Sequence, residues 1–534
     1  MAALSTSRAV LNARIPLIRN QPLIGLVLFI LCVVTAWRLG ETIAVGNTRA
    51  LAMVALVFIG CAAIIATLRD WRTGFFLFFA WMMFEDLPRK YLGNTVYLFF
   101  GKDILLAFVY VSFYLAVRRK REKTFRPPFL FFFSLFFWLG LLQIFNQNSP
   151  HVLYGVLGFK LYFYYVPLLF IGYALIRTDE DLEKFLMLNA VLTAVIAGLG
   201  VVQAIRGHQF LNPTHLAPEL RTLGNLSKSS PLSRQEFYLP DSVFVSAGRF
   251  AQFLEIAVIL VLATAAYLLL YTPRGRKVVY LAGAVVGAAI LLSGSRSAIV
   301  GGIMNVLVLC GGFLWGAPWR WMQAHRLVRA IRRSFIVTAI GLAALILMFP
   351  EAAGSRLAFY TETLNPNSSA YELSYRVWNY PIENLLRVFD NPHWVLGNGI
   401  GTGSLGAQYV AKFIGQPVPA WVEEGYGDLI LEMGIIAPFL WILWAAALLY
   451  YLWKVVHQLR QTRLFPIAFA IFWYAFCLLF LWTYGGLAPY QDYICSAYLW
   501  LLVGILFRLP DALANPTALA VSARRFATRG GFQF

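Results

Sequence analysis

The sequence predicts an all-α protein that crosses a membrane many times. Of its 534 residues, 60% are hydrophobic and only 13% are charged, and the mean hydropathy is +0.68. Soluble domains carry roughly twice that share of charged residues. A membrane-spanning helix needs about 20 mainly apolar residues, and the chain contains fourteen apolar runs that predict such helices. The runs are 22–37, 50–68, 74–84, 103–117, 129–145, 154–176, 185–205, 250–271, 278–293, 297–317, 335–349, 434–452, 464–482 and 494–507.

Charge predicts the orientation, because cytoplasmic loops collect Lys and Arg. With a cytoplasmic N-terminus and alternating loops, the cytoplasmic side holds 28 of the 44 basic residues but 7 of the 25 acidic ones. The basic stretches 118–121 and 320–333 then both lie inside. We therefore expect both termini in the cytoplasm. The net charge of +19 then reflects topology and contact with the lipid bilayer, and no binding of nucleic acid is expected.

The predicted spans divide the chain into four parts. Residues 1–349 hold the first eleven spans and an outer loop at 206–248, and residues 350–433 form a large outer loop. Residues 434–508 hold the last three spans, and 509–534 form a cytoplasmic tail. The loop at 350–433 is the one outer segment with room for a folded site. Both long loops are expected on the same, outer face.

Several motifs lie at the edges of these loops. The run before the helix at 297–317 ends in Ser-Gly-Ser-Arg296-Ser. An arginine at the outer membrane edge is energetically costly unless it pairs with another group or has a functional role. Within the large loop, Pro381 is expected to open a helix that lies flat on the membrane. The glycine-rich segment 397–403 follows, and it is read either as a flexible turn or as a loop whose amides approach an anion or a sugar.

These motifs resemble those of a known family. The segment 291–298 is similar to the Ser-Arg motif of the O-antigen ligase and Wzy-type O-antigen polymerase superfamily. The order continues to match through a large outer loop with Arg376, the glycine-rich segment, and the segment 423–434 at the entry to the next helix. The resemblance covers about 80 to 450. It departs from the ligases at Glu423 and Glu424, which stand where those proteins carry His-Asn.

The resemblance implies a substrate and roles for several residues. The family acts on glycans that are linked through pyrophosphate to a polyprenyl lipid. Arginine binds phosphate oxygens in bidentate fashion, so Arg296, Arg249 and Arg376 are candidate pyrophosphate ligands. The alternative is that they anchor helices at the interface by snorkelling. Glu423, with Glu424 second, is the candidate base that takes the proton of the attacking hydroxyl. The alternative is an acidic pair that favours a helix start.

Two further residues are candidates for support. Glu255 is expected below Arg249 on one helix, where it could hold an arginine. Lys160 lies near the outer end of another helix, where it would contact pyrophosphate or, as we favour, snorkel. No Asp-x-Asp occurs in the outer loops, so no metal is expected, and no cofactor is expected either.

The leading hypothesis is a membrane glycosyltransferase of the metal-independent, GT-C-like kind. It would polymerise lipid-linked oligosaccharide repeat units at the periplasmic face of a bacterial inner membrane. Its partners would be a polyprenyl-pyrophosphate-linked donor and acceptor, and other proteins of glycan assembly and export. The alternatives are a ligase that transfers lipid-linked glycan to another acceptor, a transporter, and a non-catalytic assembly scaffold.

Overall fold

The computed structural model describes residues 48–93, 96–120, 122, 124–212, 227–271, 275–319, 321–419 and 421–514. The chain divides into two compact units after Ala66. The first unit contributes most of one described helix, α3 (Thr48–Arg69), which is apolar and long enough to cross a membrane. The predicted run at 22–37 and most of the predicted tail lie outside the described residues.

The second unit is mostly helical. Its first half contains α4 (Trp71–Phe84), α5 (Asp86–Leu92), α6 (Val96–Arg118), α7 (Leu130–Gln143), α8 (Val152–Phe163), α9 (Leu168–Leu175) and α10 (Asp179–Arg206). After the first long loop come α11 (Ala247–Leu270), α12 (Arg276–Leu292), α13 (Arg296–Gly316) and α14 (Trp321–Met348). The last part contains α19 (Ile436–Gln458), α20 (Phe465–Phe476), the π-helical η4 (Cys477–Trp482), α21 (Thr483–Gly485), α22 (Ala488–Gln491) and α23 (Tyr493–Ala514).

Among the described residues of both units, nine helices are long and apolar enough to cross a membrane. This confirms the prediction of a multi-pass α-helical membrane protein. The runs predicted at 74–84, 129–145, 278–293 and 335–349 also form helices, namely α4, α7, α12 and α14. These helices fall outside that set of nine, so the count of fourteen spans stays a prediction. The helix α23 continues to Ala514, past the predicted start of the tail.

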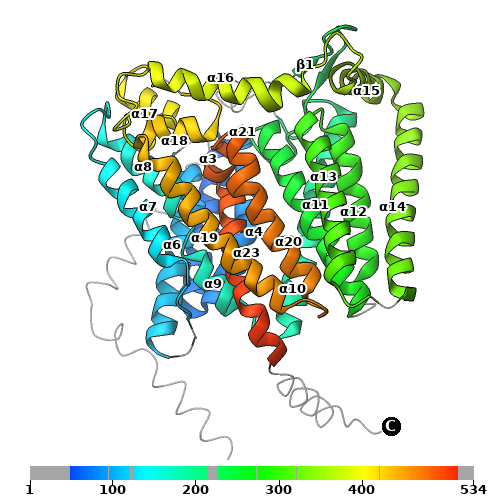
Figure 1. Ribbon diagram of the computed structural model, residues 1–534, viewed down its shortest axis with the longest axis horizontal. Helices are drawn as coiled ribbons and strands as arrows, with labels where there is room; N and C mark the ends of the chain where they lie inside the picture. Colours follow the sequence, from blue (N-terminus) through cyan, green and yellow to red (C-terminus); the bar gives the residue numbers. More distant parts are fainter. Residues whose placement is uncertain are drawn as a thin grey trace, which may run out of the picture. The chain divides into compact units, whose positions relative to one another are not determined.

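The short elements of the two long loops gather at one end of the long helices (Figure 1). The second loop forms α15 (Pro350–Leu364), the π-helical η2 (Tyr375–Asn379), α16 (Tyr380–Arg387), the 3-10 helix η3 (Val388–Asp390), α17 (Ala407–Ile414) and α18 (Gly425–Met433). The first loop contains an antiparallel pair of strands, β1 (Ser227–Ser229) and β2 (Glu236–Tyr238), in which Ser227 lies opposite Tyr238. This hairpin is a small exception to the all-α prediction.

The helix predicted at Pro381 forms, one residue earlier. It begins at Tyr380 and has the proline in its first turn, where a missing N–H donor is tolerated. Figure 1 shows α16 lying across the ends of the long helices. The apolar side chains of Ile382 and Leu386 on α16, and of Phe389 in the following η3, are exposed. An exposed apolar face fits the expected position at the membrane surface.

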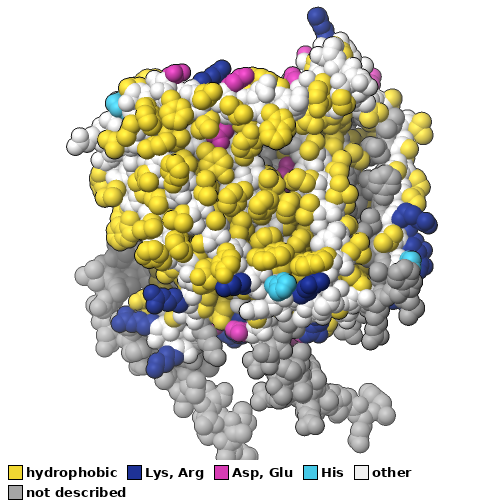
Figure 2. All heavy atoms as spheres, viewed as in Figure 1, with side chains coloured by type: hydrophobic (Ala, Val, Ile, Leu, Met, Phe, Trp, Pro, Cys, Tyr) yellow, Lys and Arg dark blue, Asp and Glu magenta, His cyan; other side chains and the backbone are white. Residues whose placement is uncertain are grey.

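Charged side chains are unevenly spread on the face seen in Figure 2. Basic side chains gather mainly at the end opposite α16, acidic ones gather mostly at the α16 end, and a broad hydrophobic band separates them. Because cytoplasmic segments collect Lys and Arg, this pattern agrees with the predicted orientation, in which the α16 end faces outward.

Glycines allow some of the closest helix contacts. At Gly172 of α9 a Cβ would collide with the backbone of Leu501, and at Gly504 of α23 it would collide with that of Leu169. Small residues let helix backbones approach in a membrane, where dispersion rather than water exclusion holds helices together. These two glycines therefore set the spacing of α9 and α23.

A largely buried network of ion pairs connects the helices. Arg249 bonds to Asp86 at 2.5 Å and to Asp492 at 2.6 Å, and Asp86 also bonds to Arg89 at 2.5 Å. Separate pairs join Lys102 to Glu85 at 2.9 Å, Lys160 to Asp103 at 2.7 Å and Lys90 to Asp241 at 3.0 Å. The carboxylates and the cations match in number. A buried charge is tolerated when it is paired in this way.

We expect the network to be needed for stability. In Lys102→Met, Glu85 would remain buried without its partner, and breaking such a pair costs roughly 3–5 kcal/mol. The measurement is the thermal unfolding midpoint of the purified protein in detergent. The matched control is Lys184→Met, which breaks the exposed pair with Glu180 on α10 and should change the midpoint little. Equal effects of the two variants would contradict this role of the network.

Candidate functional site

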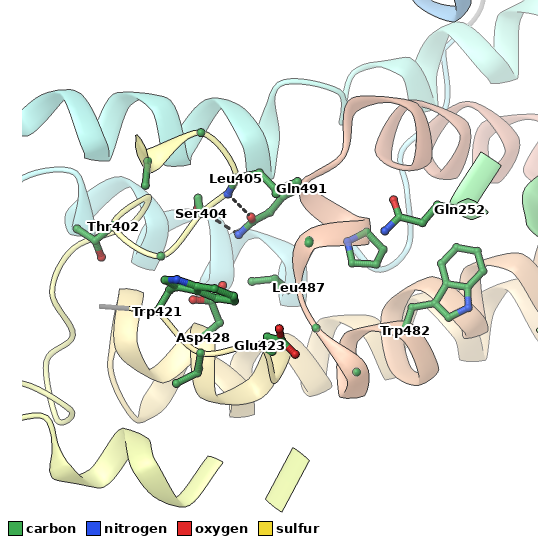
Figure 3. Close-up of a pocket in the computed structure, with 18 of the residues that line it drawn as sticks. Gln252, Thr402, Ser404, Leu405, Trp421, Glu423, Asp428, Trp482, Leu487 and Gln491 are labelled. Atoms are coloured by element: carbon green, nitrogen blue, oxygen red, sulfur yellow. Dashed lines mark hydrogen bonds between the residues drawn. The ribbon is translucent and has the colours of Figure 1, made fainter. Parts of the chain in front are cut away.

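An open pocket of about 620 Å³ lies where the second long loop meets the ends of the long helices (Figure 3). Its volume falls in the range of roughly 300–1,000 Å³ that is typical of ligand sites. Its walls come from α11, from the start of α13, from the segment after the glycine run, from the segment that leads into α18, and from the turn between η4 and α22. The polar and aromatic side chains that line it are Gln252, Glu255, Ser297, Thr402, Ser404, Gln408, Trp421, Glu423, Asp428, Trp482 and Gln491.

The glycine run lies next to this pocket and reaches its wall only at its last two residues, Thr402 and Gly403. Gly397, Gly399 and Gly401 all have positive φ, between 78° and 99°, which glycine adopts without strain. A Cβ at Gly401 would collide with the backbone of α8. The amides of Asn398 and Gly399 donate to carbonyls at the end of α18. The run therefore packs closely against α8 and α18, and the amides of Asn398 and Gly399 are not free to bind an anion or a sugar.

A fully bonded polar cluster supports the wall from behind. The carboxylate of Glu432 accepts hydrogen bonds from Tyr162 at 2.8 Å, from Ser404 at 2.6 Å and from the amide of Gly403 at 3.0 Å. Gln491 donates to Ser404 and accepts from the amide of Leu405, as Figure 3 shows. These bonds consume most of the polar groups behind the wall, so the cluster holds the pocket in shape.

Glu424 and Glu423 are adjacent but have different environments. Glu424 is the N-cap of α18, where its side chain accepts hydrogen bonds from the amides of Tyr426 and Gly427. It is buried, and burial raises the pKa of Glu424 to about 7. This geometry fits the interpretation that a helix start favours a carboxylate. It leaves Glu424 little freedom to act on a substrate.

Glu423 instead faces the pocket with an exposed carboxylate. Its side chain is 46% exposed, accepts a hydrogen bond from Tyr380 at 2.5 Å, and lies 3.6 Å from Arg376. The guanidinium of Arg376 also lies over the ring of Tyr380, 4.5 Å from its centre. The structure thus brings two predicted site residues together at the rim of the pocket, joined by a tyrosine that the sequence analysis did not single out.

A group of cations lies next to this rim. Arg296 is the first residue of α13, which Ser295 caps, and it bonds to Glu372 at 2.9 Å. Lys228 of β1 and Arg296 both lie over the ring of Phe359, at 5.6 Å and 5.4 Å from its centre. Burial and the nearby Arg296 and Arg376 guanidinium groups lower the pKa of Lys228. We call Lys228, Arg296 and Arg376 the cationic rim.

The Ser-Arg motif has a structural reason for its glycine. Gly294 has a φ of 69°, and a Cβ there would come within 2.6 Å of both Phe237 and Leu239. The hairpin therefore packs directly on the motif, and this packing brings Lys228 toward Arg296. A cation in the first turn of a helix is disfavoured by the helix dipole. An anion bound at the rim would therefore offset both the unfavourable interaction of Arg296 with the dipole and the repulsion among the three cations.

Two predicted residues have other partners than expected. Arg249 is bonded through Nε and Nη1 to Asp492 and Asp86, so we place it in the buried network and outside the cationic rim. Lys160 bonds to Asp103, and its side chain is only 16% exposed. The expectation that Lys160 snorkels is therefore wrong, because a buried carboxylate lies within its reach. It is not among the residues that line the pocket.

Glu255 and Asp428 complete the inner wall. Glu255 is buried on α11 and faces Gly301 of α13, where a Cβ would come within 2.9 Å of the carboxyl. Within the described ranges, no arginine pairs with it, so the expectation that it holds an arginine is wrong. Asp428 lies one turn before Glu432 on α18. Burial, then Glu432 and Glu424, raise the pKa of Asp428 well above its usual range.

The sequence motifs did not point to Lys228, to Tyr380 or to the role of Asp428. Lys228 lies 68 residues before Arg296, in a loop that carries no recognised motif. The signal that was available for Asp428 was its spacing of four residues from Glu432, which places both on one face of α18. Among the tryptophans of the loop, Trp421 lines the pocket, whereas Trp378 is 66% exposed.

We expect Glu424 to make stability depend on pH. Its pKa is raised on folding from 4.5 to about 7, so the folded state binds a proton more tightly than the unfolded state. Stability then falls as pH rises from about 4.5 to about 7, by up to about 3 kcal/mol. The measurement is the unfolding midpoint between pH 5 and 8 for the natural protein and for Glu424→Gln. The variant should lose this part of the dependence, and parallel curves would contradict the assignment.

Comparisons of the chain with models of protein families, with curated proteins and with solved structures find no match. The resemblance to the O-antigen ligase and polymerase superfamily therefore rests on the sequence motifs, and the function is inferred from those motifs together with the geometry of the pocket.

Proposed function

We propose that this protein is a membrane glycan polymerase that joins lipid-linked oligosaccharide repeat units at its outer face. The observation that carries the proposal is the separation of charge at the pocket. The cationic rim offers three positive groups, the interior offers the acidic side chains of Glu255 and Asp428, and the carboxylate of Glu423 lies where the two regions meet. A pyrophosphate leaving group and a sugar that develops positive charge need this arrangement.

The leaving group accounts for the cationic rim. When the bond from the anomeric carbon to the pyrophosphate oxygen breaks, the electron pair stays on the pyrophosphate. Arg296 and Arg376 can bind its oxygens in bidentate fashion, and Lys228 adds a point charge. Glu372, now bonded to Arg296 and 46% exposed, can turn to solvent when an anion replaces it.

Glu423 is suited to accept the proton of the attacking hydroxyl. As the acceptor oxygen bonds to the anomeric carbon, its proton must leave, and a carboxylate within hydrogen-bond reach can take it. Tyr380 and Arg376 fix the position of this carboxylate from one side. The transition state of glycosyl transfer resembles an oxocarbenium ion, which the carboxylate of Glu423 at the pocket can stabilise.

A ligase would use the same donor chemistry and differ in its acceptor. The replacement of the ligases' His-Asn by Glu423 and Glu424 favours the polymerase. The test therefore has to measure what happens to the glycan.

The first test is the length and lipid attachment of glycan in cells that lack the gene. We expect single repeat units to accumulate on the lipid carrier, and long chains to disappear. Glu423→Gln should reproduce this defect at normal protein level, because loss of a general base lowers the rate by roughly 10²–10⁴-fold. The matched control is Glu383→Gln, which alters a similar tyrosine–glutamate bond, with Tyr375, away from the pocket.

The other outcomes of this test are distinct. Long chains that stay on the carrier would indicate the ligase. Normal glycan in the deletion strain would contradict both the polymerase and the ligase hypotheses and would favour the transporter hypothesis. Normal glycan with Glu423→Gln alone would contradict the role of Glu423.

Lys228 should contribute mainly to binding of the lipid-linked donor. A hydrogen bond to a charged group is worth about 1.5–3 kcal/mol, so Lys228→Ala should raise the KM for donor by roughly tenfold or more. Lys228→Arg should retain most of the affinity. The exposed Lys412 on α17 provides the control, Lys412→Ala, which should leave the KM unchanged. An unchanged KM in Lys228→Ala would remove this lysine from the donor site.

A further inference from the structure

The helix α14 has an exposed face that is rich in arginine. It lies at the edge of the bundle, packs against α12 and leads into α15 (Figure 1). Four of its exposed side chains are Arg326, Arg329, Arg332 and Arg333. Because an α-helix turns about 100° per residue, the four fall within a strip roughly 120° wide. We call them the arginine face, and Figure 2 shows basic side chains gathered on this part of α14.

The arginine face has no acidic partner within the described ranges, where no carboxylate forms an ion pair or a hydrogen bond with it. The chain has no Asp or Glu between Glu255 and Glu351, so α12, α13 and α14 offer none. Like charges three or four residues apart on a helix repel each other and destabilise it. A group of cations without compensation therefore favours a ligand that carries negative charge.

An apolar stripe continues the arginine face toward the end of α14 that meets α15. Ile336, Ile340 and Leu347 are exposed, and they fall within the same strip of the helix surface. Figure 2 shows hydrophobic side chains above the basic ones on this helix. Exposed apolar side chains on a helix of a multi-pass membrane protein contact acyl chains. The arginines follow directly on this region, where lipid headgroups lie.

The length of the apolar part adds a second constraint. The stretch 335–348 rises only about 20 Å, whereas the hydrocarbon core of a bilayer is about 30 Å thick. At this depth Arg332 and Arg333 are costly unless their charges reach back to the headgroups or lipid phosphates come to them. Helical side chains tilt toward the N-terminus of the helix, which for α14 points away from the apolar stripe. The two guanidinium groups are therefore directed toward headgroup phosphates.

We propose that the arginine face of α14 binds the headgroups of acidic phospholipids in the leaflet at the end of the bundle opposite α16. Guanidinium groups bind phosphate oxygens in bidentate fashion and stay charged. Clusters of basic residues next to a membrane-spanning helix recognise acidic lipids in this way. The inference does not depend on the proposed function.

Two alternatives account for the arginines without a lipid site. The bias of cytoplasmic segments toward Lys and Arg explains cations on this side of the membrane. It does not explain why four of them share one exposed strip that continues into the apolar stripe. An acidic segment of another protein would match the charge, but it would have to reach Arg332 and Arg333 at the depth of the acyl chains.

The test is native mass spectrometry of the full chain in micelles of a neutral detergent. The protein is titrated with phosphatidylglycerol, which is acidic, or with phosphatidylcholine of the same acyl chains, which is zwitterionic. At low salt we expect phosphatidylglycerol to bind at least about tenfold more tightly. High salt should reduce this preference, because ions screen exposed charges.

Matched variants separate a specific site from the overall charge of the protein. The triple variant Arg329→Gln, Arg332→Gln, Arg333→Gln should bind the two lipids nearly equally. The control Arg118→Gln, Arg119→Gln, Lys120→Gln removes the same charge from exposed residues at the end of α6. Those three are consecutive and therefore point in different directions, so the control should keep most of the preference. Elution as a monodisperse peak establishes that each variant is folded.

Several results would overturn the proposal. The natural protein could bind both lipids equally, or the α14 variant could keep the preference of the natural protein. An equal loss in the two triple variants would show that net charge, and not the arginine face, attracts the lipid. Binding of a glutamate decapeptide to the natural protein, without any lipid preference, would assign the face to an acidic protein segment instead.

Discussion

The position of the pocket depends on one largely buried arginine, Arg249. Arg249 bonds to Asp86 at the start of α5 and to Asp492 just before α23, and thereby joins three helices that are far apart in the sequence. Asp492 follows Gln491, which lines the pocket. An arginine taken out of water is stable only while both carboxylates stay in place, so the network fixes the relative positions of α5, α11 and α23. The same ion pairs therefore also hold the pocket wall on the α22 side in place.

Rigidity behind the pocket contrasts with freedom at its rim. Glu432, Ser404 and Gln491 have their polar groups bonded, whereas Glu423, Arg376 and Glu372 are about half exposed. Exposed ion pairs are weak and exchange readily with other partners. The proposed binding and release of a charged lipid would need such pairs, because a buried pair would resist the exchange. The structure therefore places adaptable charges where a substrate would arrive and fixed ones where the wall must hold.

Sequence reasoning located the helices well and the partners of individual residues poorly. Apolar runs determine helices locally, and so the long spans of the structure coincide with runs in the sequence. The position of Arg296 at a helix start was also predictable, because Ser295 is a typical N-cap. In contrast, the partners of Arg249 and Lys160 depend on which helices pack together. Lys228 could not be recognised, because it approaches Arg296 only through the packing of Phe237 against Gly294.

Glu423 and Glu424 show why neighbouring identical residues can differ in function. A single carboxylate can cap α18, since the first turn offers only a few free N–H groups in one direction. Glu424 occupies that position with its backbone extended, at φ −78° and ψ 133°. Successive side chains of an extended segment point to opposite sides, so Glu423 is directed away from the helix start and toward Tyr380. The helix that immobilises one carboxylate thus presents the other to the pocket, which gives a physical reason for two consecutive glutamates at this site.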